Sequence, residues 1–211
     1  MDHLVIAVSR TSGCGGLAVG RALAEKMGVE YYDSKLLRMA SEDSGISEQL
    51  FANADEKVKR SLLSKIKKKL HPGEVLPPES SDFTSSQNLF NYQAKVIREI
   101  AANSSCVIVG RCAEYVLAEH PKMFSVFVTG SRRKCAERYA HDHAVSVKEA
   151  IARTEEVNKF RADYHEYYTG RDWGDPANYD LCISTDHMSV DACAKVILTA
   201  AKVKFGEEDA E

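Results

Sequence analysis

The apolar residues of the chain fall into short continuous runs that alternate with longer amphipathic stretches. A short continuous run is typical of a strand that is buried on both faces. The predicted strands cover residues 4–8, 31–32, 106–109, 125–129 and 179–184. The predicted helices cover residues 17–27, 34–44, 47–70, 87–102 and 146–164, and two more begin near residues 131 and 189. This order predicts an α/β fold with a parallel sheet flanked by helices.

The helical stretch between the second and third predicted strands is expected to be an insertion. It covers residues 34–103 and contains a Pro- and Ser-rich loop at 71–86. Residues 1–33 and 104–211 would then form the core. After the polar helix that ends near residue 164, a loop carrying Tyr164, Tyr167 and Tyr168 is expected. These rings suit either stacking on a base or packing against the protein.

A glycine-rich turn joins the first predicted strand to the first helix. Residues 9–17 are Ser-Arg-Thr-Ser-Gly-Cys-Gly-Gly-Leu. Such a turn directs successive backbone N–H groups at one point, and the N-terminus of the following helix adds partial positive charge. The turn therefore predicts a phosphate-binding loop. The alternative is a glycine turn before a helix in an unrelated α/β fold.

The turn departs from the full phosphate-loop motif, G-x-x-x-x-G-K-[ST]. Aligned on Gly15, the chain has Arg10 for the first glycine, Gly16 for the lysine and Leu17 for the Ser or Thr that binds magnesium. A positioned charge on the transferred group is worth several kcal/mol of barrier. An active enzyme must take this charge from elsewhere, and Arg10 and Arg21 are candidates.

Composition and charge narrow the class of protein. The chain has 211 residues, of which 44% are hydrophobic and 28% charged, as in an ordinary globular domain. Its formal net charge of −3 gives no basic field that would attract nucleic acid or a membrane surface. No apolar run approaches the roughly 20 residues of a membrane helix. The first residues do not resemble a signal peptide, so we expect a cytoplasmic protein.

The cysteines and histidines form no metal-binding pattern in the sequence. The six cysteines are scattered without a CxxC pair. They are expected to be reduced and to pack as small apolar residues, with Cys106 and Cys182 in apolar strands and Cys14 accessible in the glycine loop. The seven histidines are assigned no role. A basic run at residues 57–69 suits a solvated helix face better than an anion-binding surface.

Four segments together resemble cytidylate kinases over nearly the whole chain. These segments are the glycine loop at 6–16, Asp33 with Ser34, Arg111 after the third strand, and Arg138 with the Asn158–Arg161 pair. The chain also resembles a group of cytidylate kinase-like proteins whose loop, Ser-Arg-x-x-Gly-x-Gly-Gly, likewise lacks the lysine. The segments 161–170 and 173–176 match this group as well.

The resemblance implies a P-loop kinase fold and transfer of a phosphoryl group from ATP to a nucleoside monophosphate (CMP- or dCMP-like) or a related small acceptor. Backbone amides would bind the donor phosphates. The residues implied for this task are Ser12, Gly13, Cys14, Gly15, Gly16 and Leu17. Mg²⁺ would be held mainly by the nucleotide and water, since no protein ligand for the metal is implied.

The resemblance also implies where the acceptor binds. Arg111 would bind its phosphate, Asp33 and Ser34 would line its site, and the 34–103 insertion would contribute to that site. A lid near residues 138–170, which includes Asn158, would close over the phosphates. Catalysis would fall to Arg10, Arg138 and Arg161.

The sequence departs from cytidylate kinases at several of these positions. Lys35 replaces a glycine, Cys112 an acidic residue and Asn158 an aspartate. Two alternatives therefore stay open: a nucleotide-binding regulator without catalysis, and a kinase for a non-nucleotide small molecule. The arginines are also compatible with a solvated surface, and Asp33 with a helix N-cap.

Overall fold

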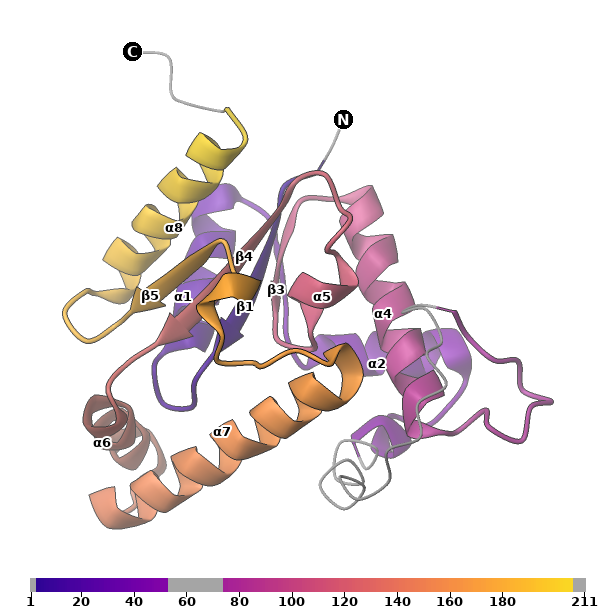
Figure 1. Cartoon of the computed structure of the whole chain (residues 1–211), viewed down its shortest axis with the longest axis horizontal. Helices are drawn as coiled ribbons and strands as arrows, with labels where there is room; N and C mark the ends of the chain where they lie inside the picture. Colours follow the sequence, from indigo (N-terminus) through magenta and orange to yellow (C-terminus); the bar gives the residue numbers. More distant parts are fainter. Residues whose placement is uncertain (1–2, 53–73, 207–211) are drawn as a thin grey trace.

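The computed structural model describes residues 3–52 and 74–206 of the chain (Figure 1). Its five strands form one parallel sheet in the order β2-β3-β1-β4-β5. The strands are β1 (Val5–Arg10), β2 (Glu30–Tyr32), β3 (Cys106–Val109), β4 (Met123–Thr129) and β5 (Leu181–Ser184). The predicted α/β class with a parallel sheet is confirmed.

Helices connect the strands and cover both faces of the sheet (Figure 1). They are α1 (Gly16–Met27), α2 (Lys35–Ser44), α4 (Ser86–Asn103), α5 (Ala113–Val116), α6 (Arg132–His143), α7 (Val147–Thr169) and α8 (Val190–Lys204). Residues 48–52 are also helical, and Pro176–Asn178 form a 3-10 turn.

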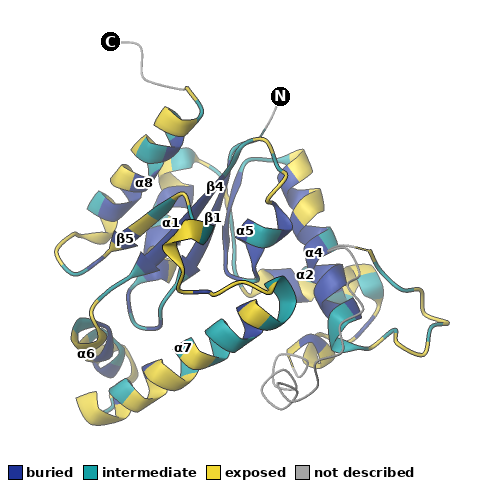
Figure 2. Cartoon of the chain, viewed as in Figure 1, coloured by how far each residue is buried: buried dark blue, intermediate teal, exposed yellow. Residues whose placement is uncertain are grey.

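The central strand, β1, carries apolar side chains on both faces of the sheet, so both faces must be covered by helices. Its residues alternate between the two faces, and they are buried on each of them (Figure 2). Ile6 and Val8 belong to a core with α1 and α8, whereas Val5 and Ala7 belong to a core with α2 and α4. The segment 34–103, expected to be an insertion, thus supplies two helices that share a core with the sheet.

Helix α7 lies across the edge of the sheet where β1 and β3 end (Figure 1). It packs on α6 through small residues, Ala136, Ala140 and Ala150. Its outer side is largely exposed (Figure 2). Because ligands bind at the carboxyl ends of parallel strands, α7 covers the part of the fold where a site is expected.

The tyrosine-rich loop predicted after residue 164 is wrong. Helix α7 continues through all three tyrosines to Thr169 and ends at Gly170, which adopts a left-handed conformation. Tyr168 stacks on Phe90 of α4, with ring centroids 4.2 Å apart. This contact between distant segments supports the extra turn of helix, and local sequence does not reveal it.

Two expectations about cysteines are also corrected. Cys14 is fully buried, and its thiol donates to the carbonyl oxygen of Val128 at 3.4 Å, so it is not accessible. Cys182 is exposed because β5 is an edge strand. The basic run at 57–69 lies outside the described residues. Within 3–52 and 74–206, no helix is both long and apolar enough to cross a bilayer.

Candidate active site

The glycine loop connects the end of β1 to the start of α1. Gly13 and Gly15 have φ angles of 76° and 82°, in the region that side chains disfavour. A Cβ atom on Gly13 would lie 2.3 Å from the carbonyl oxygen of Cys135. Glycine at position 13 is therefore required both by the backbone conformation and by the close approach of α6.

Side chains from other elements hold the carbonyl groups of this loop. Arg138 Nη1 donates to the carbonyl oxygen of Gly13 at 2.7 Å, and the Thr185 hydroxyl donates to that of Cys14 at 2.8 Å. In a trans peptide the following N–H points the opposite way. The amides of Cys14 and Gly15 are therefore turned away from these two side chains.

Most backbone amides of the loop are available to bind an anion. Among the described residues, none accepts a hydrogen bond from the amides of residues 13–17. The Ser12 amide differs, because it donates to Asn158 Oδ1 on α7 at 2.7 Å. Five of the six amides predicted to bind phosphate thus remain available at the N-terminus of α1, where an anion is favoured. The Leu17 side chain is exposed and offers no metal ligand.

A cavity of about 280 Å³ lies beside the loop, under α7. Three arginines line it, Arg10, Arg111 and Arg161, and Asp33 is the only carboxylate among its described lining residues. The cavity is also lined by Ser34 and by three aromatic residues, Phe160, Tyr164 and Trp173. The excess of cations indicates an anionic ligand.

The side chain of Arg10 extends between two glycines. A Cβ atom on Gly16 would lie 2.6 Å from Arg10 Cβ, and one on Gly110 would lie 2.4 Å from Arg10 Nη1. The side chain thus passes from the glycine loop to the end of β3. Its Nε is buried and has no hydrogen-bond partner among the described residues. Burial, together with the charge of Arg111, lowers the pKa of Arg10.

Arg161 brings a second guanidinium from α7 to the same place. Its Nη1 donates to the carbonyl oxygen of Arg10 at 2.9 Å. Burial and the nearby Arg10 charge lower the pKa of Arg161 to about 10. Two buried cations that repel each other favour a bound anion, which would neutralise both.

Arg111 reaches the cavity from an unusual turn. Gly110, Arg111 and Cys112 follow β3 with consecutive φ angles of 83°, 59° and 53°. Left-handed backbone at two successive non-glycine residues is rare and is often found at functional sites. The Arg111 guanidinium carbon lies 6.0 Å from the centre of the Tyr164 ring.

Asp33 and Ser34 follow β2 and face the same cavity. The Ser34 hydroxyl donates to Asp33 Oδ1 at 3.1 Å. Burial alone would raise the pKa of Asp33, but hydrogen bonds to its carboxylate, first from Ser34 and then from Tyr31 and the Lys35 amide, outweigh burial and lower that pKa. Asp33 is therefore a carboxylate at neutral pH. The three predicted acceptor residues, Asp33, Ser34 and Arg111, thus meet in one place.

The remaining predicted residues lie at the loop rather than in the cavity. Arg138 contacts the Gly13 carbonyl oxygen, and Asn158 contacts the Ser12 amide, so both hold the loop in its conformation. Arg21, a candidate for the missing charge, is largely exposed at 4.0 Å from Asp33 and does not line the cavity. Arg10 and Arg161 link the residues at the loop to those in the cavity, because both side chains line the cavity and Arg161 binds the carbonyl oxygen of Arg10 at the start of the loop.

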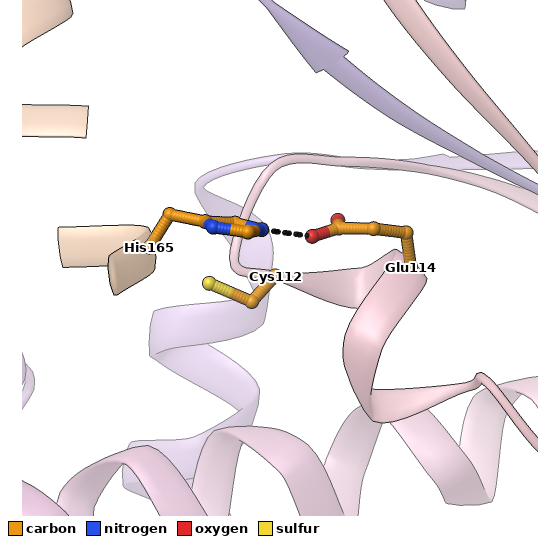
Figure 3. A group of neighbouring side chains, drawn as sticks. All are labelled: Cys112, Glu114 and His165. Atoms are coloured by element: carbon orange, nitrogen blue, oxygen red, sulfur yellow. Dashed lines mark hydrogen bonds and ion pairs between the residues drawn. The ribbon is translucent and has the colours of Figure 1, made fainter. Parts of the chain in front are cut away.

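One buried group was not anticipated from the sequence. Cys112, Glu114 and His165 converge (Figure 3) at the wall of the cavity, which Cys112 and His165 line. His165 Nε2 lies 2.8 Å from Glu114 Oε1, and both side chains are almost fully buried. No spacing rule could have paired residues that are 51 positions apart on different elements. A Glu three residues after Arg111, which follows β3, is the nearest local signal.

Comparisons with known proteins bear on the fold and on the family of the chain. A crystal structure of an uncharacterized protein from Eubacterium ventriosum ATCC 27560 is 28% identical, with a TM-score of 0.69 over 95% of this chain and 99% of that one. Shikimate kinase from Bacteroides thetaiotaomicron is 12% identical, with a TM-score of 0.50 over 96% and 98% of the two chains, and is similar in fold alone. None of the curated proteins matches the chain.

A family model decides the assignment. The cytidylate kinase-like family matches residues 5–187, which include the glycine loop, the cavity and α7. A kinase-like family and a kinase-like fold together support phosphoryl transfer as the general class of reaction. The α/β fold is accordingly of the P-loop type, and the chain belongs to the cytidylate kinase-like family.

Proposed function

We propose that the protein transfers a phosphoryl group from ATP to a nucleoside monophosphate of the CMP or dCMP type, or to a related small anionic acceptor. One observation carries the proposal. Three guanidinium groups meet in a cavity beside five available loop amides, with Asp33 as the only lining carboxylate among the described residues. This arrangement suits two sets of phosphate oxygens placed close together.

The donor would bind at the glycine loop. The amides of residues 13–17 would hold its phosphates, and Arg10 would take the place of the motif lysine. Mg²⁺ would be bound by nucleotide oxygens and water, since Leu17 replaces the usual hydroxyl ligand. Its contribution would be to neutralise negative charge on the phosphates. The donor would be the ATP of the cytoplasm, which is the compartment that the sequence predicts for this protein.

The acceptor would bind in the cavity through its own anionic group. Arg111 is the natural partner for this group because it follows β3 at the carboxyl edge of the sheet. A planar guanidinium binds two phosphate oxygens at once. Asp33 and Ser34 would orient the part of the acceptor that faces β2. The aromatic wall formed by Phe160 and Tyr164 suits an apolar or aromatic portion.

Transfer itself would depend on positioning and charge. Phosphoryl transfer requires little covalent assistance from the protein. Arg10 and Arg161 lie where the donor and acceptor sites meet, since each lines the cavity and Arg161 binds the last residue of β1. Fixed charges in a desolvated site stabilise developing charge more strongly than water does. Helix α7, which carries Arg161, would also exclude water from the site.

A coupled assay of ADP release over a panel of nucleoside monophosphates and small phosphorylated or carboxylated metabolites tests the proposal. We expect turnover with at least one pyrimidine monophosphate. Turnover with a non-nucleotide alone would favour the kinase for another small molecule. ATP binding without turnover on any acceptor would favour the nucleotide-binding regulator, and absence of ATP binding would contradict both.

A further inference from the structure

We propose that Cys112, Glu114 and His165 form a binding site for a transition-metal ion of the zinc type. This site is distinct from the magnesium that accompanies ATP, and its existence does not rest on the proposed phosphoryl transfer. The three side chains come from the β3–α5 turn, α5 and α7, and all three are buried. Figure 3 shows the Cys112 sulfur beside the His165 ring that faces Glu114.

The donor atoms and their spacing suit such an ion. One sulfur, one nitrogen and one carboxylate oxygen lie within 4.8 Å of one another. Zinc binds these atoms at about 2.0–2.3 Å in tetrahedral geometry, which places neighbouring donors roughly 3–4 Å apart. Small side-chain movements would close the set around an ion. A thiolate and an imidazole favour zinc over magnesium or calcium, which prefer oxygen ligands.

Surrounding residues fix the histidine in the orientation that a ligand needs. His165 Nδ1 lies 3.0 Å from the carbonyl oxygen of Arg171 and 3.2 Å from Thr169 Oγ1. The Thr169 hydroxyl donates its hydrogen to the His165 carbonyl oxygen at 2.7 Å, so its oxygen accepts from Nδ1. Nδ1 therefore carries a hydrogen, and Nε2 faces Glu114. Metal-bound histidines are commonly held by this kind of outer hydrogen bond.

Charge balance permits a divalent ion near the arginines. A hydrogen bond between Glu114 and His165 Nε2, which lie 2.8 Å apart, requires one proton between them, and a Cys112 thiol would carry another. Binding one divalent ion releases both protons, so the charge of the group does not change. Arg10, Arg111 and Arg161 would otherwise repel an added cation. Cys112 and His165 also line the cavity, which provides an entry path and a fourth position for water.

Cobalt is the probe that reports this ligand set directly. The full chain is stripped with a chelator under reducing conditions and titrated with Co²⁺. We expect saturation at one ion per chain, a thiolate-to-cobalt absorption band in the near ultraviolet, and visible bands as intense as those of four-coordinate cobalt. Equimolar Zn²⁺ should displace the cobalt. Weak six-coordinate bands without the thiolate band, or failure to bind, would overturn the proposal.

Single substitutions test whether the thiolate-to-cobalt band and the Zn²⁺ affinity depend on Cys112 and His165. Cys112→Ser, which changes one atom, should abolish the thiolate band and weaken Zn²⁺ binding at least about 100-fold. His165→Gln should weaken it similarly. Thr169→Val removes the hydroxyl that contacts Nδ1 and leaves the Arg171 carbonyl oxygen in place, and it should weaken Zn²⁺ binding about 10-fold. The control is Cys182→Ser, in an exposed cysteine of β5. Circular dichroism confirms folding. A band that survives Cys112→Ser, or disappears in Cys182→Ser, would overturn the assignment.

Discussion

The side chain of Arg10 fills the space that a side chain at position 16 would need. A Cβ atom on Gly16 would lie only 2.6 Å from Arg10 Cβ and 3.0 Å from its Cγ. Aligned on Gly15, Arg10 stands at the first glycine of the phosphate-loop motif and Gly16 stands at its lysine. We interpret the two departures from the motif as a single exchange, in which the long basic side chain comes from the strand end instead of the helix.

The first prediction concerns this contact. Gly16→Ala should lower the free energy of unfolding by about 1–3 kcal/mol, because the added methyl group overpacks Arg10 in a buried position. Chemical denaturation measures the effect. Gly174→Ala is the control, since the nearest atom to its added Cβ, in the part of the chain that the structure describes, is a side-chain oxygen 3.5 Å away. Equal stability of the Gly16→Ala variant and the wild type would refute the overpacking.

The second prediction tests the exchange itself. Gly16→Lys alone should lose turnover, because the new side chain collides with Arg10. Arg10→Gly combined with Gly16→Lys restores the motif arrangement and should recover more turnover than either single change. A double-mutant cycle on kcat/KM gives the coupling between the two positions, expected to be about 1–3 kcal/mol. Additive effects would mean that the two residues act independently.

The third prediction concerns the positive charges that would stabilise the phosphoryl group during its transfer. Arg10→Ala and Arg161→Ala should each lower turnover at least about 100-fold, or roughly 3 kcal/mol of barrier, because each removes a buried cation where the two proposed sites would meet. Arg10→Lys should not restore full turnover, since lysine lacks the planar fork. Arg133→Ala, in an exposed arginine of α6, is the control for steady-state kinetics. Near-normal turnover in folded Arg10→Ala would show that another group supplies the charge.

The fourth prediction separates acceptor from donor binding. Arg111→Ala should weaken monophosphate binding by about 2–4 kcal/mol and leave ATP binding nearly unchanged, because Arg111 lines the cavity after the end of β3 and is not part of the glycine loop. Titration calorimetry with each ligand measures both. Equal losses for the two ligands would indicate that Arg111 bridges both sites or supports the fold.

The fifth prediction follows from the repulsion between the buried guanidinium groups of Arg10 and Arg161. Inorganic phosphate at 100 times its dissociation constant should stabilise the wild type by about 2.7 kcal/mol, with sodium chloride of equal ionic strength as the control. Arg161→Met should remove most of this stabilisation. It should also raise the stability of the ligand-free protein by about 1 kcal/mol, because relieving the desolvated charge gains about 3 kcal/mol and the lost hydrogen bond costs about 2 kcal/mol.

Thermal unfolding with and without phosphate measures both parts of this prediction. A less stable ligand-free Arg161→Met variant would mean that the hydrogen bond from Arg161 to the carbonyl oxygen of Arg10 outweighs the cost of burying the charge.

The order of the strands and of the longer helices among the described residues follows from the sequence alone, because each buried strand is a continuous apolar run and the glycine loop sits at the first strand–helix junction. The position of Arg111 and Asp33 directly after strands also predicts, from local pattern, that they reach the carboxyl edge of the sheet. These features depend on residues close together in the chain, so they can be inferred without knowing what packs against them.

Tertiary structure decided where the side chains at that edge go. The path of Arg10 depends on the space left by Gly16 and Gly110, and the last turn of α7 depends on Tyr168 stacking on Phe90. The pairing of Glu114 with His165 joins α5 to α7 across 51 positions. Such contacts arise only when separate elements pack together, because their energies come from burial and from partners that the local sequence does not contain.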